Sequence, residues 1–352
     1  MGSEMCIRDS YDVLHVQNFT DVDDKIINTA NKEGVLWSDV CGRYIDAYFE
    51  VMDKLNVRRA HVYPRVSEHM EEIIETVKAL IDRGYAYEMD GDVYYSVEKF
   101  EHYGELSGRN LEDMMAGARV DVNDKKHNPM DFALWKAAKP GEPSWSSPWG
   151  EGRPGWHIEC STMSMKYLGE TFDFHGGGSD LIFPHHENEI AQSEACNGKE
   201  FSHYWMHNAF LNIDNRKMSK SLGNFLLVRD IEKKYDLQVL RFFMLSAHYR
   251  SPLNFSAELM EAAKNGLDRI LTCAAWLQKQ SANEGEITNQ ESEVIEKAKK
   301  YVGKFEAAME DDFNTADAIA AIFELVKYGN TNKTDELSGK AAKALYLSLI
   351  HI

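Results

Sequence analysis

The chain has 352 residues, of which 43% are hydrophobic and 27% are charged, and its formal net charge is −18. This length is enough for two or three domains with a sizeable core, and no apolar run approaches the roughly 20 residues of a membrane span. The negative charge argues against nonspecific binding of polyanions, but it leaves room for a local basic surface that binds a nucleic acid.

The two ends of the chain differ from the rest of it. Residues 1–10 and 347–352 each fit the translation of a transposase-type sequencing adapter, and the second fits the reverse complement of the first. Translated library sequence is excluded from fold reasoning, as tags and fusion scars are. We therefore expect the authentic sequence to cover residues 11–346, as an internal fragment of a longer gene that is cut at both ends.

The cysteines indicate a reducing compartment. Cys6 lies in the adapter-like start, and the other four have no paired spacing: Cys41, Cys160, Cys196 and Cys273. Scattered cysteines of this kind do not suggest a disulfide framework. We expect a cytoplasmic protein without a membrane anchor.

The first part of the chain predicts strands and helices in alternation. Residues 11–16 carry apolar side chains in a loose alternation and predict a buried strand. The acidic residues before Ile26 suit the start of a helix. Ser67 is expected to cap a second helix, whose apolar residues recur at helical spacing until Gly84 ends it.

The middle of the chain predicts a hairpin, a loop and one further strand. Residues 86–89 and 92–97, joined by an Asp-Gly pair, predict a β-hairpin with a type I′ turn. Residues 139–155 are rich in glycine and proline and predict a loop. A strand is expected over residues 171–174, and a helix is expected to begin near Pro184.

The character of the sequence changes after Pro252. Ser256 is expected to cap a helix with apolar residues at helical spacing, and further helices are predicted over residues 290–309 and 315–327. The polar residues 279–289 predict a loop between helices. The whole pattern indicates an α/β domain followed by a helical bundle.

A lysine-containing segment points to phosphate chemistry. Lys217 and Lys220 flank Met218 and Ser219, and Ser221 follows them, before Leu-Gly-Asn. Lysine is a mobile point charge suited to a phosphate, and glycine and small hydroxyl residues let a loop change shape. The segment predicts a flexible clamp that acts at a nucleotide phosphate; a solvated surface loop is the alternative.

A second set of residues has the donor types of a zinc site. His185 and Glu189 are four residues apart and would share one face of a helix, and Cys160 lies upstream. Three protein ligands and an open position are typical of catalytic zinc. A buried cysteine and a helix surface pair are the alternative. Neighbours that could replace or support these ligands are His175, His186 and Glu187.

The glycine run before Asp180 is a weaker signal. Gly176, Gly177 and Gly178 would allow a ligand to approach the backbone closely. Asp180 could accept a hydrogen bond from a ribose hydroxyl, as acidic residues do in nucleotide folds. A plain turn between a strand and a helix is the alternative.

Together these residues resemble the cysteinyl-tRNA synthetases, a family of class I aminoacyl-tRNA synthetases. The resemblance covers nearly all of residues 11–346. It rests on residues 18–25 (NFTDVDDK), 152–160 (GRPGWHIEC), 176–189 (GGGSDLIFPHHENE), 217–221 (KMSKS) and 309–315 (MEDDFNT). The lysine loop is shared with other class I synthetases, whereas the WHIEC and FPHHENE segments are far more specific to this family.

The resemblance implies a domain organisation. Residues 11–250 would form a Rossmann-type α/β catalytic domain whose amino-terminal part is missing, with a connective insertion near residues 86–150 and a stem-contact region near residues 215–250. Residues 251–346 would form a truncated, tRNA-binding helical bundle. The family's small carboxyl-terminal anticodon-binding domain would be cut off.

The resemblance also implies a reaction and its substrates. A monomer would activate L-cysteine with ATP and Mg²⁺ to cysteinyl-adenylate and transfer it to tRNA(Cys). Lys217 and Lys220 would neutralise the leaving phosphates. The other expected nucleotide contacts are Gly177, Gly178, Asp180, Ser219 and Ser221. Trp156 would line the cysteine pocket, with a core tryptophan as the alternative.

The same resemblance implies one Zn²⁺, held by Cys160, His185, Glu189 and a fourth ligand. In the family that fourth ligand is a cysteine just before a His-Ile-Gly-His motif near the amino terminus. Neither feature is present here, and Cys41 lies in a helical pattern. We therefore expect this fragment itself to be inactive.

Three other functions fit parts of the pattern. The cysteine ligase of mycothiol synthesis uses the same adenylation chemistry with an amino-sugar acceptor, but the helical segment around residues 311–315 favours the tRNA enzyme. A non-catalytic zinc- or RNA-binding paralogue would not need the intact lysine loop. A metallohydrolase would not explain that loop either.

Overall fold

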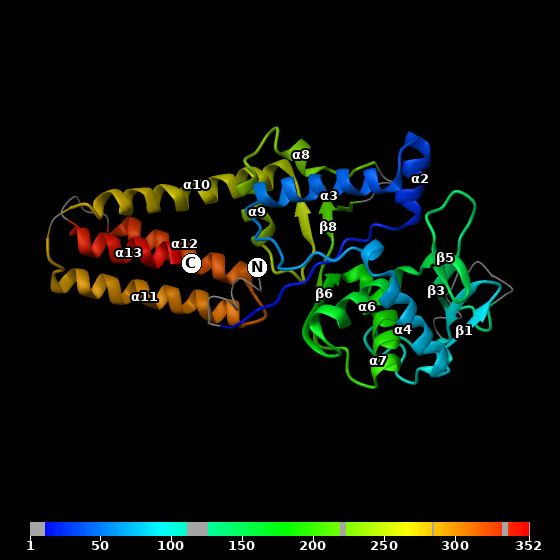
Figure 1. Ribbon diagram of the computed structural model, residues 1–352. Coiled ribbons are helices and arrows are strands. Elements are labelled where there is room, and N and C mark those ends of the chain that lie inside the picture. The colour runs from blue at the N-terminus through cyan, green and yellow to red at the C-terminus, as the bar shows by residue number, and fades with distance from the viewer. Residues whose placement is uncertain (1–10, 111–125, 219–222, 284, 333–336, 352) are drawn as a thin grey trace. The chain divides into compact units, whose positions relative to one another are not determined.

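The structure is a computed structural model in which the chain divides into two compact units (Figure 1). Unit 1 consists of Met1–Asp53 and Val57–His207, and unit 2 consists of Lys54–Asn56 and Asn208–Ile352. The described residues are 11–110, 126–218, 223–283, 285–332 and 337–351. Within these ranges no helix has the length and apolar character to cross a membrane.

Unit 1 contains an antiparallel sheet of five strands in the order β1-β2-β3-β5-β4. The strands are β1 (Ala86–Met89), β2 (Asp92–Tyr95), β3 (Phe132–Ala137), β4 (Trp145–Ser147) and β5 (Gly150–Pro154). The predicted hairpin is confirmed, because Asp90 and Gly91 have φ values of 54° and 85°, as a type I′ turn requires. Its second strand ends at Tyr95 and not at residue 97, because a 3₁₀ turn, η2 (Val97–Lys99), follows.

The loop predicted over residues 139–155 is wrong for its second half. β4 and β5 lie there, and β5 pairs with β3 while β4 pairs with β5. Glycines and a proline weaken the local strand signal. The pairing partner β3 lies outside the predicted loop, so the hydrogen bonds between strands decide the structure here.

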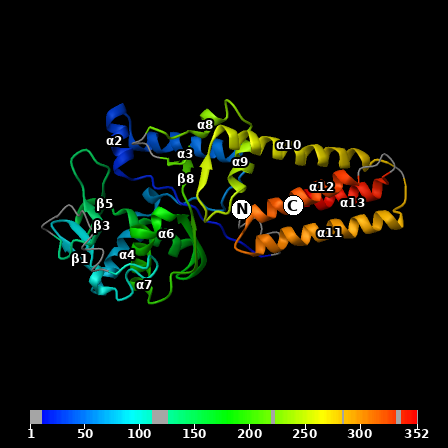
Figure 2. The same cartoon turned by 180° about the vertical axis from the view of Figure 1, so that it is seen from behind.

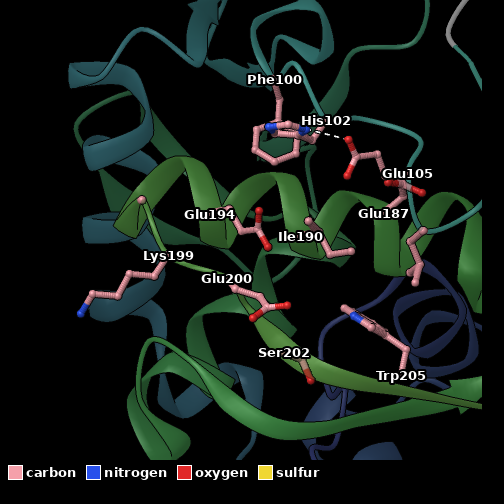
Figure 3. Close-up of a pocket in the computed structure, with 12 residues that line it drawn as sticks. Phe100, His102, Glu105, Glu187, Ile190, Glu194, Lys199, Glu200, Ser202 and Trp205 are labelled. Carbon is pink, nitrogen blue, oxygen red and sulfur yellow. Dashed lines mark hydrogen bonds and ion pairs between the residues drawn. The ribbon is translucent and has the colours of Figure 1, made fainter.

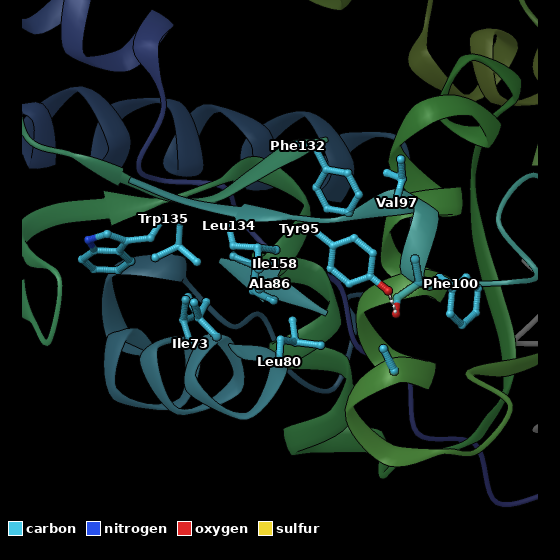
Figure 4. Close-up of a cluster of buried hydrophobic side chains, with 14 of the residues drawn as sticks. Ile73, Leu80, Ala86, Tyr95, Val97, Phe100, Phe132, Leu134, Trp135 and Ile158 are labelled. Atoms are coloured by element: carbon cyan, nitrogen blue, oxygen red, sulfur yellow. Dashed lines mark hydrogen bonds between the residues drawn. The ribbon is translucent and has the colours of Figure 1, made fainter. Parts of the chain in front are cut away.

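Helix α4 (Met70–Asp82) packs its apolar face into the main core of unit 1. Ile73, Val77 and Leu80 are fully buried, at helical spacing, against residues of the sheet such as Leu134 (Figure 4). Tyr95 is also fully buried, and its hydroxyl donates to the carbonyl oxygen of Ala191 at 2.9 Å (Figure 4). The hydroxyl of this buried tyrosine therefore has a hydrogen-bond partner, and the bond links the sheet to the helix that carries Ala191.

The start of α4 differs from the prediction. Ser67 does not cap the helix but lies in a 3₁₀ turn, η1 (Val66–Glu68), and His69 precedes the first helical residue. The Ser67 backbone N–H and hydroxyl both donate to the buried carboxylate of Asp21, at 3.0 and 2.5 Å. Ser67 therefore bonds to Asp21, which is distant in the sequence, and does not cap the helix.

The buried strand predicted over residues 11–16 is also wrong. Only isolated parallel bridges form here, between Val16 and Val62 and between Phe19 and Arg65. Leu14 is 52% exposed, so the segment is not a core strand. Helix α2 (Asp24–Glu33) follows as expected, with Asp23 as its cap, and α3 (Trp37–Lys54) contains Cys41.

The remaining elements of unit 1 carry the candidate site. Helix α6 (Trp156–Leu168) follows β5 directly, and β6 (Phe172–Gly178) forms a two-stranded sheet with β7 (Ser202–Asn208). β6 is longer than the predicted strand and contains the glycine run. Two short turns, η3 (Ser179–Leu181) and η4 (Ile182–His186), lead into α7 (Glu187–Asn197).

Unit 2 begins with a small sheet whose strand order is β10-β8-β9. The strands are β8 (Leu211–Ile213), β9 (Arg216–Lys217) and β10 (Leu253–Phe255), and the short helices are α8 (Val228–Ile231) and α9 (Leu237–Leu245). β10 and β8 are parallel, so the chain after Pro252 returns to this sheet before the long helices begin.

Four long helices complete unit 2 and lie side by side in both views (Figures 1 and 2). They are α10 (Ala257–Gln280), α11 (Asn289–Glu310), α12 (Thr315–Thr331) and α13 (Gly339–His351). The predicted cap is confirmed, because the Ser256 hydroxyl accepts from the Leu259 N–H at 3.2 Å. α13 was not predicted, and it runs through residues 347–351, with Leu349 in the bundle core.

Candidate functional site

Three potential metal ligands come together in unit 1. Cys160 lies on α6, His185 in the turn η4 and Glu189 in the first turn of α7. Their ligating atoms lie within 4.8 Å of one another. His185 stands before the regular helix rather than on it, but the spacing of four residues still brings its Nε2 to 2.7 Å from Glu189 Oε1.

The carboxylate of Glu189 is fully buried and lies between two imidazoles. Its oxygens are 2.7 Å from His185 Nε2 and 2.9 Å from His175 Nε2, yet neither contact has hydrogen-bond geometry. Burial alone would raise the pKa of Glu189, but His175 and His185 outweigh it and hold that pKa below its usual range. A buried carboxylate that stays ionised and lacks hydrogen bonds fits a cation.

His185 is oriented by a second histidine. Its Nδ1 lies 2.8 Å from Nδ1 of His157, so one ring donates to the other. Burial lowers the pKa of His157 to about 3, which keeps that ring neutral and able to accept. With a metal bound, His185 would carry its proton on Nδ1 and turn the lone pair of Nε2 to the metal, because a hydrogen-bond partner at one ring nitrogen fixes which nitrogen is left for the metal.

Cys160 has a polar neighbour on its other side. The Asn18 side-chain amide donates to its sulfur at 3.6 Å. Burial raises the pKa of the Cys160 thiol, and the carboxyls of Glu189 and Glu159 raise it further. A cation beside the sulfur supplies the opposing charge that would favour the thiolate.

Trp156 lies beside one of these ligands. It is 48% exposed, and its ring centroid lies 4.3 Å from that of His185. A core tryptophan would be buried, so the alternative weighed from the sequence does not hold. The indole stands at the surface with its ring beside a ligand.

The lysine loop lies in the other unit. The backbone of Lys217 pairs with Asn212 in the β8–β9 ladder, and Met218 N–H donates to the Leu211 carbonyl at 3.3 Å. Lys220, Ser219 and Ser221 lie outside the described residues. The described part therefore shows that the loop starts from a sheet edge.

Comparison with known proteins identifies the family. The family model described as "tRNA synthetases class I (C) catalytic domain" matches residues 4–265, and the one described as "DALR domain" matches residues 304–351. The curated cysteine–tRNA ligase of Clostridioides difficile (strain 630) is 57% identical over 335 residues, which is 95% of this chain and 72% of that protein. The cysteine–tRNA ligase of Carboxydothermus hydrogenoformans is 58% identical over 91% of this chain and 68% of its own.

The chain belongs to the cysteine–tRNA ligase family of class I tRNA synthetases. The resemblance predicted from the sequence is confirmed, as is the class I catalytic fold followed by a helical region. Among solved structures, methionyl-tRNA synthetase of Mycobacterium tuberculosis in complex with methionyl-adenylate has a TM-score of 0.72 at 14% identity, over 99% of this chain and 82% of that one. This likeness concerns the fold alone.

One glycine of the glycine run lies close to a histidine of the site. A Cβ on Gly177 would lie 2.9 Å from Cε1 of His186, and one on Gly178 would lie 2.5 Å from Oδ1 of Asp180. Gly177 therefore lets strand β6 approach the His186 ring closely, whereas the carboxylate of Asp180 ends an exposed side chain that can rotate away from position 178. Asp180 itself is exposed in η3.

The other acidic and basic side chains near the three candidate ligands divide into two groups. Glu187 accepts from the backbone N–H groups of Gly104 and Ser107, at 2.8 and 3.0 Å, so it fastens a loop and is not a ligand. His175 and His186 form a second possible ligand group with Glu189. His186 Nδ1 also lies 2.8 Å from Nε2 of His207, on strand β7.

Sequence reasoning did not assign roles to Asn18, His157 and His207. Asn18 and His157 lie inside segments that carried the family resemblance, so a signal was present for both. His207 lies in no recognised segment. Its place beside His186 follows from the pairing of β6 with β7, which brings distant parts of the chain together.

A separate hollow of about 570 Å³ lies on the other side of α7 (Figure 3). Its lining includes Phe100, His102, Ile190, Glu194, Lys199 and Trp205. The three candidate ligands do not line it. The Trp205 ring also contacts His175 and His186, with centroids 4.8 and 5.2 Å apart, so this indole separates the hollow from the histidines.

Proposed function

We propose that this chain's site activates L-cysteine with ATP for transfer to tRNA(Cys), and that Zn²⁺ held by Cys160, His185 and Glu189 selects the amino acid. The observation that carries the proposal is the buried carboxylate of Glu189 beside a thiol and an imidazole, with all three ligating atoms within 4.8 Å. Thiolate, imidazole and carboxylate are the donor types that zinc prefers, and three protein ligands leave a position for a substrate.

Zinc would supply a soft Lewis acid that binds the cysteine thiol as a thiolate, whereas the harder serine hydroxyl is a much poorer ligand. The chain's own residues prepare this selection. His157 fixes the proton of His185, Asn18 donates to Cys160, and Trp156 lines the position next to His185. A site built around one chemical group can reject an analogue that lacks this group by about 10⁴-fold. An apolar pocket discriminates between similar substrates far less.

The fourth ligand is proposed to be a cysteine that the described residues do not contain. Cys41 is a poor candidate, because its thiol is buried and donates to the carbonyl oxygen of Asp21 at 3.1 Å. Burial also raises the pKa of Cys41 to about 11, which disfavours the thiolate that a metal needs. The identity of the fourth ligand and the inactivity of the chain on its own both stay predictions.

The adenylation step needs charge stabilisation. The cysteine carboxylate attacks the α-phosphate of ATP, and pyrophosphate leaves with Mg²⁺. We propose that Lys217 and Lys220 neutralise the leaving phosphates, with Ser219 and Ser221 as further phosphate contacts. Gly177, Gly178 and Asp180 would hold the adenosine, and the exposure of Asp180 supports a role in binding a ligand.

The domain assignment is part of the proposal. We propose a connective insertion near residues 86–150, and the five-stranded sheet over residues 86–154 supports it. We also propose a stem-contact region near residues 215–250 and a tRNA-binding bundle over residues 251–346, two ranges that both belong to unit 2. A cytoplasmic location and a monomeric state stay predictions, and size-exclusion chromatography with light scattering tests the second.

Metal analysis of cysteine variants tests the zinc site. In the purified chain supplied with zinc, Cys160→Ser should lose the bound metal, because a serine oxygen is a far weaker ligand. Cys196→Ser is the matched control, because that half-buried cysteine lies at the end of α7 outside the ligand set. Equal zinc content in the parent chain and the Cys160 variant would contradict the assignment.

An exchange assay tests the lysine loop. In a full-length protein that carries this sequence, Lys220→Ala should slow ATP–pyrophosphate exchange strongly and leave zinc content unchanged, because the lysine stabilises charge on the leaving phosphates. Lys233→Ala is the control, since Lys233 is exposed and pairs with Asp230. Equal exchange rates for the parent and the Lys220 variant would remove the loop from the mechanism.

A further inference from the structure

The two helices that carry Cys160 and Glu189 share a buried polar contact. Helices α6 and α7 pack against each other, and the fully buried Ser161 of α6 lies between them. Its hydroxyl donates to the main-chain carbonyl oxygen of Glu189 at 3.2 Å. The side-chain amide of Gln192, three residues further along α7, donates to the Ser161 oxygen at 2.8 Å. The contact therefore joins the residue after one candidate ligand to the backbone of another.

The two hydrogen bonds fix the direction of the Ser161 hydroxyl. A serine hydroxyl has one proton to donate, and it rotates to suit its partners. The Gln192 amide nitrogen can only donate, so it occupies a lone pair of the Ser161 oxygen. The hydroxyl proton is then left for the carbonyl oxygen of Glu189. Gln192 thus orients Ser161, and Ser161 holds the turn of α7 from which the Glu189 carboxylate projects.

Stability alone does not account for this contact. Gln192 is fully buried, and its Oε1 has no hydrogen-bond partner among the described residues. A buried acceptor without a partner costs free energy, and an apolar side chain of similar size would avoid that cost. The next residue of α6 differs from Ser161, because the Thr162 hydroxyl donates to Thr76 of α4 at 3.2 Å. The Ser161 bond is directed instead at the helix that carries a candidate ligand.

A metal site is sensitive to the separation of the helices that carry its ligands. Bonds from zinc to sulfur, nitrogen and oxygen are about 2.0–2.3 Å long, and a functional group must be held within about 0.5 Å of its productive place. Cys160 and Glu189 belong to different helices. The Ser161 bond begins one residue after Cys160 and ends on Glu189 itself, so it limits sliding of α6 along α7 at the level of the ligands.

We propose that Ser161, oriented by Gln192, is a positioning residue that sets the distance between Cys160 and Glu189 for the metal. The inference rests on the zinc site of the proposed function and adds to it two residues that do not touch the metal. Loss of a hydrogen bond that orients a metal ligand typically weakens metal binding by about 10- to 100-fold. The Ser161 bond acts on the backbone of Glu189 and not on its carboxylate, so the lower end of that range applies.

Zinc affinities of two serine variants test the proposal in the full chain. Ser161→Ala should raise the Kd for zinc about tenfold, measured in competition with a chelator, because the bond between the two helices is lost. Ser193→Ala is the matched control. It removes the same atom from a buried serine of α7 whose hydroxyl has no partner among the described residues, so the Kd for zinc should equal that of the parent chain.

A cobalt spectrum separates positioning from a general effect on helix packing. Co²⁺ binds the same donor types as zinc, and its visible absorption depends on its coordination geometry. At saturating Co²⁺ the spectrum of Ser161→Ala should differ from that of the parent chain, whereas Ser193→Ala should give the parent spectrum. Gln192→Leu should weaken zinc binding by a smaller factor, because the Ser161 hydroxyl loses the group that orients it. This variant decides the question if Ser161→Ala does not fold.

Four results would contradict the inference, and they differ in what else they affect. Parent-like zinc affinity in Ser161→Ala or in Gln192→Leu removes the positioning role and leaves the zinc site standing. An equal loss of affinity in Ser193→Ala does the same. So does a parent-like cobalt spectrum in Ser161→Ala, because the loss of affinity then comes from weaker helix packing. A parent chain that binds neither zinc nor cobalt overturns the zinc site and the positioning role together.

Discussion

At the scale of single residues, the site depends on backbone positions as much as on ligands. Gly155 precedes the helix that carries Trp156 and Cys160, and its N–H donates to the Leu134 carbonyl of strand β3 at 2.8 Å. A Cβ on Gly155 would lie 1.9 Å from the carbonyl oxygen of Ala133. The glycine therefore lets α6 start directly against the sheet, which places Trp156 and Cys160.

Gly155→Ala should destabilise unit 1 and disturb the metal site. The added methyl group meets backbone atoms that cannot rotate away, so the sheet or α6 must shift, at a cost of at least about 2 kcal/mol. Urea unfolding measures that cost, and metal analysis measures the zinc bound. Gly42→Ala is the control, because it makes the same change within helix α3 where nothing lies within 4 Å. Equal stability of the two variants would contradict the close-approach argument.

The ligands themselves could be predicted from the sequence to different degrees. His185 and Glu189 are four residues apart, so local spacing brought them together. Cys160 and its partner Asn18 are 142 residues apart in the chain, and only the family resemblance placed that part of the sequence near the site. His207 carried no signal, because its neighbour His186 is reached through the pairing of two strands.

At the scale of elements, helices were more predictable than strands. The apolar periodicity predicted α4, α10, α11 and α12 close to their observed bounds, since a helix forms its own hydrogen bonds locally. β4 and β5 were missed, because β5 is glycine-rich and becomes a strand only through its pairing with β3 and β4. For residues 11–16 the error was the reverse, because a strand was predicted that does not form. Their apolar side chains suggested a strand, but this region makes only two isolated bridges.

One element also offers a stabilising change. Gly303 lies in the exposed part of α11, and a Cβ there would have nothing within 4 Å. Gly303→Ala should stabilise unit 2 by about 0.5–1 kcal/mol, because glycine loses more backbone entropy in a helix than alanine. Chemical denaturation followed by circular dichroism measures the gain. A loss of stability would mean that α11 is strained at this point.

At the scale of the whole molecule, the chemistry is divided between the two units. The three candidate zinc ligands lie in unit 1, and the lysine loop belongs to unit 2. The change in composition after Pro252 suggested a boundary near residue 250. The compact units divide at His207, because β10 pairs with β8 and joins residues 253–255 to residues 211–213, and the domain boundary near residue 250 stays a prediction. A long-range strand pair of this kind leaves little trace in composition.

This division predicts that zinc protects one unit more than the other. A ligand that binds only the folded site stabilises it, by about 2.7 kcal/mol when free zinc is about 100 times its Kd. Hydrogen exchange should therefore slow in α6 and α7, which carry Cys160 and Glu189, and remain unchanged in α10 to α13. Chelation should reverse the effect, and Cys160→Ser should abolish it. Protection confined to unit 2, or persisting in the Cys160 variant, would mean that the metal binds elsewhere.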